Sequence, residues 1–279
     1  MLVVVGLACQ EAGAALAVLL FPEVGPLGMV MLRLVFSAVL LLLIARPSLR
    51  GHSRDGWLAV LGFGLVLALM NGLFYLALSR LPLGVTVTIE VLGPLVLSIV
   101  ASKRRSAWLW ALLAFAGVVA LAGGGWDRLD PLGVLFALGA AASWAFYILA
   151  SARVGREFPG LNGLALAMTV GALIALPFGI LSAGSALLRP DLMALGAAVA
   201  VLSSTIPYAL ELIALRRLPA AVFAILLSLA PATAALAGWL LLGQELTWLE
   251  LVGIALVITA SIGAVRSSTR AASRSTPLA

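Results

Sequence analysis

Long apolar runs separated by short polar breaks follow one another from the first residues of the chain almost to its end. Each run has about 20 residues, the length that a helix rising 1.5 Å per residue needs to cross a hydrocarbon core of about 30 Å. Membrane strands would be shorter and would alternate in polarity. The pattern predicts an all-α integral membrane protein with ten spans, which cover residues 3–20, 28–45, 56–78, 83–101, 107–124, 132–152, 160–183, 192–215, 220–242 and 247–265.

A segment in the first half of the chain recurs, diverged, in the second half. Arg80-Leu81-Pro82 is matched by Arg217-Leu218-Pro219, and each triplet is followed after the same interval by a proline inside an apolar run, Pro94 or Pro231. A proline there interrupts the helix because it has no backbone N–H to donate. Two related halves with a broken membrane helix at the same place are typical of transporters that bind their substrate between the halves.

The glycine-rich stretch at residues 123–125 divides the ten spans into two groups of five. We therefore expect a first five-helix repeat over residues 1–125 and a second over residues 131–265. Because five is odd, the second repeat must enter the membrane from the opposite side, so the duplication becomes an inverted repeat. Residues 266–279 mix serines and arginines without an apolar period, and we expect them to form a disordered cytoplasmic tail.

Composition and charge agree with a chain that lies in lipid. Hydrophobic residues make up 63% of the sequence and charged residues 10%, against about 45–50% and about 25% in an average soluble domain. The net charge of +6 does not indicate nucleic-acid binding, because the basic residues collect in alternate loops between spans. Short basic loops stay in the cytoplasm, so these loops and both termini of the multi-pass chain are expected inside.

Enzyme and cofactor signatures are missing from the sequence. The chain has one cysteine, Cys9, and one histidine, His52, which stands in a basic loop. A cysteine or histidine metal centre and a buried catalytic triad are therefore not predicted. No glycine-rich loop of the GxxxxGK[ST] type is present, so the sequence gives no support for ATP-driven transport. We expect no enzyme activity, no cofactor and no bound metal, and a protein that functions as a monomer.

Four ionisable residues lie inside the predicted spans: Glu11, Arg33, Glu90 and Glu211. A charge at the centre of a membrane costs about 2.5–3.5 kcal/mol on insertion scales, so each should face a partner or a water-filled cavity. Glu90 lies four residues before Pro94, whose missing N–H leaves the carbonyl of Glu90 unpaired. Carboxylate and carbonyl together can hold a substrate ammonium group or a proton. A structural carboxylate bonded to a neighbouring helix is the alternative.

The other three charges have more than one interpretation. Glu11, next to Gln10 near the middle of the first span, can reach Arg33 on the second span. Such a pair would lower the cost of burial, but both residues can equally contact substrate. Arg33 can hold a substrate carboxylate in a two-pronged contact. Glu211 stands about one turn from Arg216 and Arg217, so we interpret it as part of an interfacial salt bridge or gate.

Aromatic and amide residues complete the predicted cavity. Asn71 and Tyr75 are spaced to share one helix face, and so are Trp144 and Tyr147. Tyr208 follows Pro207, which with Pro94 and Pro231 forms the set of predicted hinges. The remaining tryptophans lie near span ends, as in an aromatic belt, whereas Trp144 lies within a span. Ordinary helix packing is the alternative for these aromatic residues.

Several short motifs together resemble the EamA type of the drug/metabolite transporter superfamily, and more narrowly the bacterial exporters of threonine and homoserine and the related aromatic amino acid exporters. They are Met31-Leu32-Arg33-Leu34, Met70-Asn71, Leu73-Phe74-Tyr75-Leu76, Leu81-Pro82-Leu83-Gly84, Glu90 with Gly93-Pro94-Leu95, Trp144-Ala145 with Tyr147-Ile148-Leu149, and Pro207-Tyr208 with Leu210-Glu211. The resemblance implies a protein of the bacterial inner membrane that exports amino acids from the cytoplasm through a central cavity between two inverted repeats. Glu11 departs from it, because a small residue is expected there.

The sequence therefore predicts a secondary transporter or facilitator that moves zwitterionic amino acids outward by alternating access. Its expected binding residues are Glu90, Arg33, Asn71, Tyr75, Trp144, Tyr147, Tyr208, Gln10 and Glu11. Proton coupling and facilitated diffusion both stay open. Efflux of drugs or other metabolites is the second interpretation. A membrane enzyme would need acids clustered at one interface, and a scaffold would give no reason for buried charges beside a broken helix.

Overall fold

The computed structural model describes residues 2–102, 105–121, 129–207, 210, 214 and 225–275, and no strand occurs among them. Seven helices in this part are long and apolar enough to cross a membrane, and the shorter apolar helices Trp108–Leu121 and Pro190–Thr205 accompany them. The predicted all-α membrane class is confirmed. The count of ten spans and the side on which the termini lie stay predictions, and the glycine-rich stretch at 123–125 lies outside the described residues.

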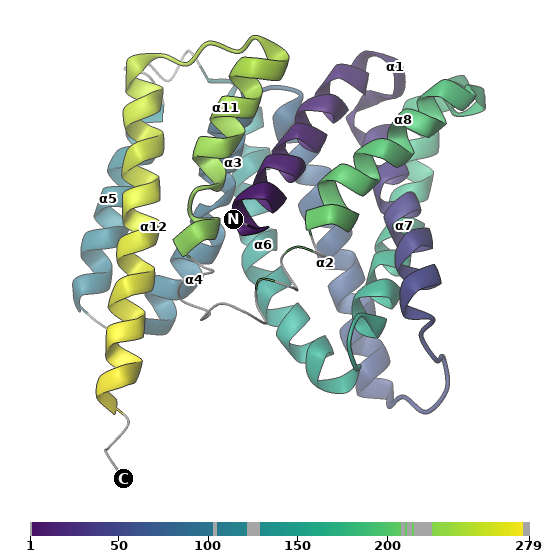
Figure 1. Ribbon diagram of the computed structural model, residues 1–279, viewed down its shortest axis with the longest axis horizontal. Helices are drawn as coiled ribbons and strands as arrows, with labels where there is room; N and C mark the ends of the chain where they lie inside the picture. Colours follow the sequence, from purple (N-terminus) through teal and green to yellow (C-terminus); the bar gives the residue numbers. More distant parts are fainter. Residues whose placement is uncertain are drawn as a thin grey trace.

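The helices follow the predicted spans closely (Figure 1). They are α1 (Leu2–Ala45), α2 (Arg54–Leu78), α3 (Leu83–Glu90), α4 (Leu92–Ser102), α5 (Arg105–Leu121), α6 (Pro131–Glu157), α7 (Asn162–Ala183), the 3-10 helix η2 (Gly184–Leu188), α8 (Pro190–Ala200), the π-helix η3 (Val201–Thr205), α11 (Ala230–Leu242) and α12 (Trp248–Ser275). The last helix runs past Arg266, so the start of the predicted tail is helical.

The first two predicted spans form two arms of α1, residues 2–24 and 26–45, which meet at a sharp bend. Gly25 makes this bend with φ 69° and ψ 163°, and it stands between Pro22 and Pro26. A side chain at this φ would be strained, and a Cβ atom there would also overlap the hydroxyl of Ser182. Gly25 therefore lets α1 turn back, and the two arms point into the same bundle (Figure 1).

Both proline-containing segments are interrupted helices. In the first half α3 ends at Glu90, Val91 forms the turn, and α4 begins at Leu92 with Pro94 in its first turn. In the second half a short helix at 225–227 stops at a turn of Ser228 and Leu229, and α11 then begins with Pro231 near its start. The interruptions stand at equivalent positions, although the first part of the second copy lies outside the described residues.

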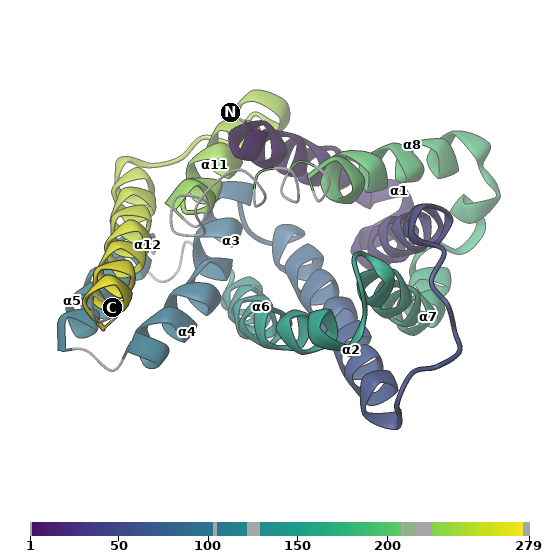
Figure 2. The same cartoon turned by 60° about the horizontal axis from the view of Figure 1, so that its bottom comes forward.

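Three pairs of helices that occupy the same position in the two predicted repeats pack against each other (Figure 2). The second arm of α1 packs on α7, α3 on α11, and α5 on α12. Glycines bring these pairs close together, because a Cβ atom on Gly84 would lie 2.8 Å from the Cα of Ala235, and one on Gly117 would lie 2.9 Å from the carbonyl oxygen of Gly253. Such close backbone approach is how membrane helices associate without a hydrophobic driving force.

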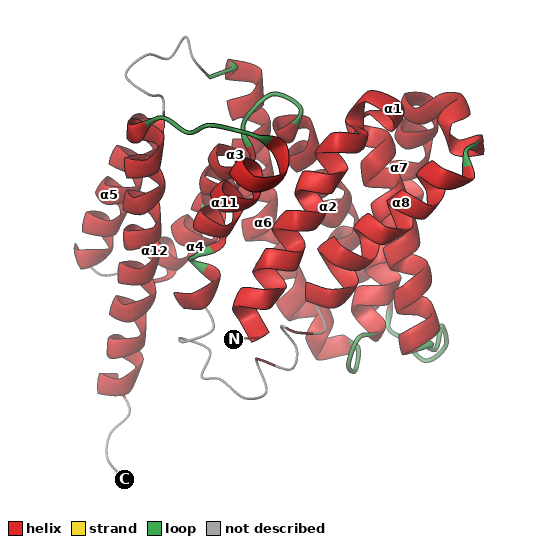
Figure 3. Cartoon of the chain, turned by 45° about the horizontal axis from the view of Figure 1, so that its top comes forward, coloured by secondary structure: helices red, strands yellow, loops and turns green. Residues whose placement is uncertain are grey.

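Polar contacts join the two halves along the edge of the bundle at which α1 bends, which Figure 3 brings forward. Arg80 Nη1 lies 2.7 Å from Asp130 Oδ2, and Arg189 Nη1 lies 2.9 Å from Glu23 Oε2. Gln244 Oε1 accepts a hydrogen bond of 2.9 Å from the N–H of Leu83, the first residue of α3. In each pair one residue comes from the first half and the other from the second, so this edge holds the halves together.

Asp130 makes one of these contacts sensitive to pH. The side-chain hydrogen bond from Arg80, together with N–H groups of Gly133 and Leu132, holds the pKa of the Asp130 carboxyl below its ordinary value. This carboxylate therefore stabilises the fold above the ordinary aspartate pKa of about 3.9, and its contribution is lost as the pH falls through the lowered value.

Asp130→Asn is accordingly expected to lower the melting temperature slightly at neutral pH and to match the wild type in strong acid. Asparagine keeps an oxygen that can cap α6, so the substitution isolates the charge. Melting curves of the purified protein between pH 3 and pH 7 test the prediction, and a difference that does not shrink below about pH 4 would contradict it.

Gly93, beside the first helix interruption, packs against the backbone of α6. A Cβ atom there would overlap the carbonyl oxygen of Ala141, which cannot move without displacing the helix. Gly93→Ala is therefore expected to destabilise the protein by about 1–3 kcal/mol. Gly72→Ala is the matched control, because a Cβ atom at Gly72 meets nothing within 4 Å. Thermal unfolding of both variants in detergent measures the difference, and equal melting temperatures would refute the prediction.

Candidate functional site

Arg33, on the second arm of α1, is the basic residue of the candidate site. It is partly buried, and its guanidinium donates from Nε to Ser204 Oγ at 3.2 Å, from Nη2 to the carbonyl oxygen of Ser203 at 3.1 Å, and from Nη1 to the hydroxyl of Tyr75 at 3.4 Å. Its central carbon also lies 5.6 Å from the centre of the Tyr75 ring. One side chain thus connects α1, α2 and η3, and it joins the two halves of the chain.

The carbonyl of Ser203 is available to Arg33 because a proline, Pro207, stands four residues later in the chain. In an α-helix the carbonyl of Ser203 would accept from the N–H of residue 207, but Pro207 has none. The chain forms the π-helix η3 at this point, with the N–H of Ile206 bonded to the carbonyl of Val201, five residues earlier. Arg33 supplies the donor that Pro207 cannot. Pro207 therefore leaves the Ser203 carbonyl without its α-helical donor, and the guanidinium of Arg33 donates to this carbonyl.

Ser203 and Ser204 were not among the residues that the sequence analysis selected. The rule that links Pro94 to the carbonyl of Glu90 also links Pro207 to the carbonyl of Ser203, so the signal was present. The two serines look ordinary in sequence because hydroxyls in membrane helices usually bond to their own backbone, as Ser203 Oγ does with the carbonyl of Val199 at 2.7 Å.

Glu11 and Glu90 lie near this arginine. Glu11, on the first arm of α1, is only 2% exposed, whereas Glu90, the last residue of α3, is partly exposed. Arg33 lies within electrostatic range of both carboxyl groups, and Glu90 lies within range of Glu11. Glu11, Arg33 and Glu90 therefore form one charge cluster, assembled from three helical segments of the first half.

The other predicted lining residues are distributed around this cluster. Tyr75 is fully buried, and its ring centre lies 5.8 Å from that of Phe21. Asn71, one turn earlier on α2, is 6% exposed and donates to the carbonyl oxygen of Leu67 at 2.8 Å. Gln10 is partly exposed and precedes Glu11 on the first arm of α1. Tyr75 is thus a predicted lining residue that contacts Arg33 directly.

Trp144 and Tyr147 on α6 belong to different packing clusters. Trp144 packs against the main core, which also contains both arms of α1 and Tyr75. Tyr147 packs in a second cluster, where its ring centre lies 5.2 Å from that of Phe63. Pro207 is buried in a helical turn, whereas Tyr208 and Glu211 lie outside the described residues. Of the two α6 residues, Trp144 is the one that shares a cluster with Tyr75.

Comparison with known proteins places this arrangement in a family. Residues 131–266 match the model of the EamA-like transporter family. The threonine/homoserine exporter RhtA of Escherichia coli K12 is 40% identical over 264 residues, which cover 94% of this chain and 89% of that protein. The chain belongs to the EamA-like transporter family. The exporter of the same name from Salmonella typhimurium LT2 is 38% identical over 94% of this chain and 90% of its own length.

More distant matches also cover most of the chain. The uncharacterized transporter YwfM of Bacillus subtilis is 28% identical over 84% of this chain and 82% of its own. A protein of known crystal structure superposes over 97% of both chains with a TM-score of 0.64 at 20% identity, which shows a common fold. The relatives are transporters, and the membership makes this chain a multi-pass bacterial membrane protein of the EamA type.

Proposed function

We propose that this EamA-like protein exports threonine, homoserine or similar zwitterionic amino acids from the cytoplasm across the inner membrane. Two observations support the proposal. The relatives that cover nearly the whole chain are named for threonine and homoserine export. The interior holds the charge cluster, in which Arg33 lies near two carboxyl groups, Glu11 and Glu90. Of these two observations, the charge cluster is the one on which the proposal mainly rests.

An amino acid carries the complement of this cluster. Its carboxylate would bond to the guanidinium of Arg33, which can hold two oxygens at once. Its ammonium group would then lie near Glu90, the more accessible of the two carboxylates. The hydroxyl and the ring of Tyr75 hold the guanidinium of Arg33 in position. The remaining proposed lining residues are Asn71, Trp144, Tyr147, Tyr208, Gln10 and Glu11. Binding both ends of a zwitterion without water between them also excludes molecules that carry one charge.

Alternating access is the proposed mechanism of movement. The interrupted helices at Val91 and at Ser228 stand at equivalent positions in the two halves, and counterpart helices of the halves pack together. These features support an inverted repeat in which the halves rock about the charge cluster. Pro94, Pro207 and Pro231 would act as hinges, because each removes a backbone hydrogen bond at a helix interruption. We propose that one chain suffices for this cycle.

Liposomes that contain the purified protein test the substrate. Labelled threonine, homoserine and phenylalanine and a cationic dye would each be measured for protein-dependent flux, with and without a pH gradient. We expect flux of threonine and homoserine above empty liposomes, and weaker flux of phenylalanine. Flux of the dye without flux of any amino acid would overturn the proposal and favour drug efflux, and acceleration by the gradient would indicate proton coupling.

A further inference from the structure

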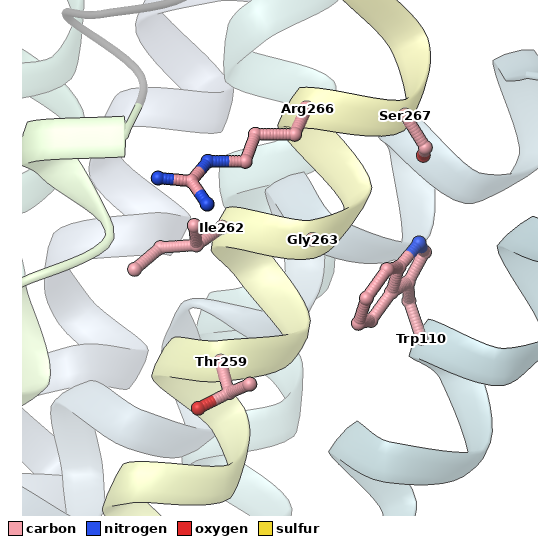
Figure 4. Close-up of a pocket in the computed structure, with 6 residues that line it drawn as sticks. All are labelled: Trp110, Thr259, Ile262, Gly263, Arg266 and Ser267. Atoms are coloured by element: carbon pink, nitrogen blue, oxygen red, sulfur yellow. The ribbon is translucent and has the colours of Figure 1, made fainter.

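A second candidate binding site lies away from the charge cluster, between α5 and α12 (Figure 4). It is a half-open groove of about 290 Å³. One wall is Trp110 of α5, and α12 supplies the rest through Thr259, Ile262, Gly263, Arg266 and Ser267. These five residues of α12 recur at intervals of three and four, so they occupy one face of the helix.

Gly263 determines the shape of the groove. A Cβ atom at this position would overlap the indole ring of Trp110, so the missing side chain lets the ring lie directly against α12. Trp110 Nε1 is buried and has no hydrogen-bond acceptor among the described residues. In Figure 4 this nitrogen lies on the edge of the ring toward Ser267, while the side chain of Arg266 extends along the opposite side of the helix. The indole nitrogen and the hydroxyl of Ser267 therefore lie on one side of α12, and the guanidinium of Arg266 lies on the other.

An exposed stripe of α12 continues from the groove. Leu251, Ala255 and Thr259 are exposed, Ile262 is partly exposed, and Arg266 is exposed one turn further on. In a membrane transporter such a stripe faces the acyl chains of lipid. Its last residue, Arg266, is a cation for which no ion pair occurs among the described side chains. The exposed stripe and Arg266 at its end form one continuous surface of α12.

We propose that this groove binds an anionic phospholipid, with one acyl chain along the stripe of α12 and the phosphate on Arg266. A free anion would gain nothing from the apolar stripe, and a neutral lipid would gain little from Arg266. Several basic residues lie near the groove in sequence: Lys103 and Arg104 before α5, Arg105 at its first position, and Arg270 and Arg274 after Arg266. They would raise the local concentration of anionic lipid. The site is independent of the proposed transport function.

Native mass spectrometry of the full-length protein in detergent tests this proposal. The protein would be mixed with phosphatidylglycerol or with phosphatidylcholine of the same chain length, and bound lipids counted. We expect preferential binding of phosphatidylglycerol, which Arg266→Gln should weaken about fivefold, the effect of one arginine at a membrane surface. Arg153→Gln is the matched control, because it removes the same charge from an exposed residue of α6 outside the groove.

Thr259→Phe provides a second variant, since it fills the groove and leaves every charge in place. It should lower phosphatidylglycerol binding while the melting temperature stays that of the wild type. Equal binding of both lipids by the wild type, equal effects of Arg266→Gln and Arg153→Gln, or unchanged binding in Thr259→Phe would each overturn the proposal. Displacement of the lipid by inorganic phosphate alone would also overturn it, because the groove would then be a simple anion site.

Discussion

Arg33→Lys is expected to abolish amino acid export, although it keeps the positive charge. A lysine has one compact ammonium group, and that group cannot reach Ser204 Oγ, the Ser203 carbonyl and the Tyr75 hydroxyl together as the guanidinium does. Losing one or two charge-assisted hydrogen bonds costs about 1.5–3 kcal/mol each, so flux should fall at least about tenfold. The measurement is threonine flux into liposomes at matched protein content.

Stability should fall in the same variant. Pro207 removes the α-helical donor of the Ser203 carbonyl, so losing the guanidinium removes a charge-assisted hydrogen bond to that carbonyl, at a cost of about 1.5–3 kcal/mol. Arg33→Gln should be worse, because it also removes the positive charge that favours the ionised forms of Glu11 and Glu90. Arg153→Lys is the control for both measurements. Wild-type flux and melting temperature in Arg33→Lys would show that the forked geometry is not needed.

Glu90→Gln is expected to eliminate export of amino acids while the protein stays folded. Glutamine preserves the size of the side chain but cannot balance a substrate ammonium group, and removing one member of a close charge pair weakens binding by about 2–5 kcal/mol. Because Glu90 is partly exposed, the substituted amide can be solvated and the fold should tolerate it. Liposome flux at several pH values, at matched folding, tests the prediction.

Glu11→Gln distinguishes the two carboxylates. Glu11 is only 2% exposed, so we expect its substitution to change the melting temperature more than the apparent affinity for substrate. Glu90→Gln should show the opposite pattern. Wild-type flux by Glu90→Gln across the pH range would remove Glu90 from the proposed site, and a larger loss of flux in Glu11→Gln would assign the ammonium contact to Glu11.

The sequence predicted those parts of the structure that follow from single residues and their spacing. Apolar run length identified the helices because backbone groups in lipid must bond within their own helix. Pro94 predicted an interruption, and α3 does end at Glu90. The cost of buried charge selected Glu11, Arg33 and Glu90, and the structure brings these three together.

Features that depend on how helices face one another could not be predicted in the same way. Trp144 and Tyr147 share a helix face to within about 60°, yet one packs with the main core and the other with Phe63, because neighbouring helices divide that face. The bend at Gly25 lies between two predicted spans, and the apolar pattern carries no signal for the backbone conformation of that residue. Contacts such as that of Gln244 with the N–H of Leu83 depend on loop paths that carry no periodic signal.

The bond from Arg33 to the carbonyl of Ser203 has a consequence for the transport cycle. A substrate carboxylate that takes two N–H groups of Arg33 must compete with an acceptor that belongs to the protein's own backbone. If the substrate wins, η3 loses one of the contacts that tie it to α1, and the two halves lose one of their links. Loading of the cargo and release of the scaffold would then be a single exchange of hydrogen bonds, so an empty carrier would resist reorientation and a loaded one would not.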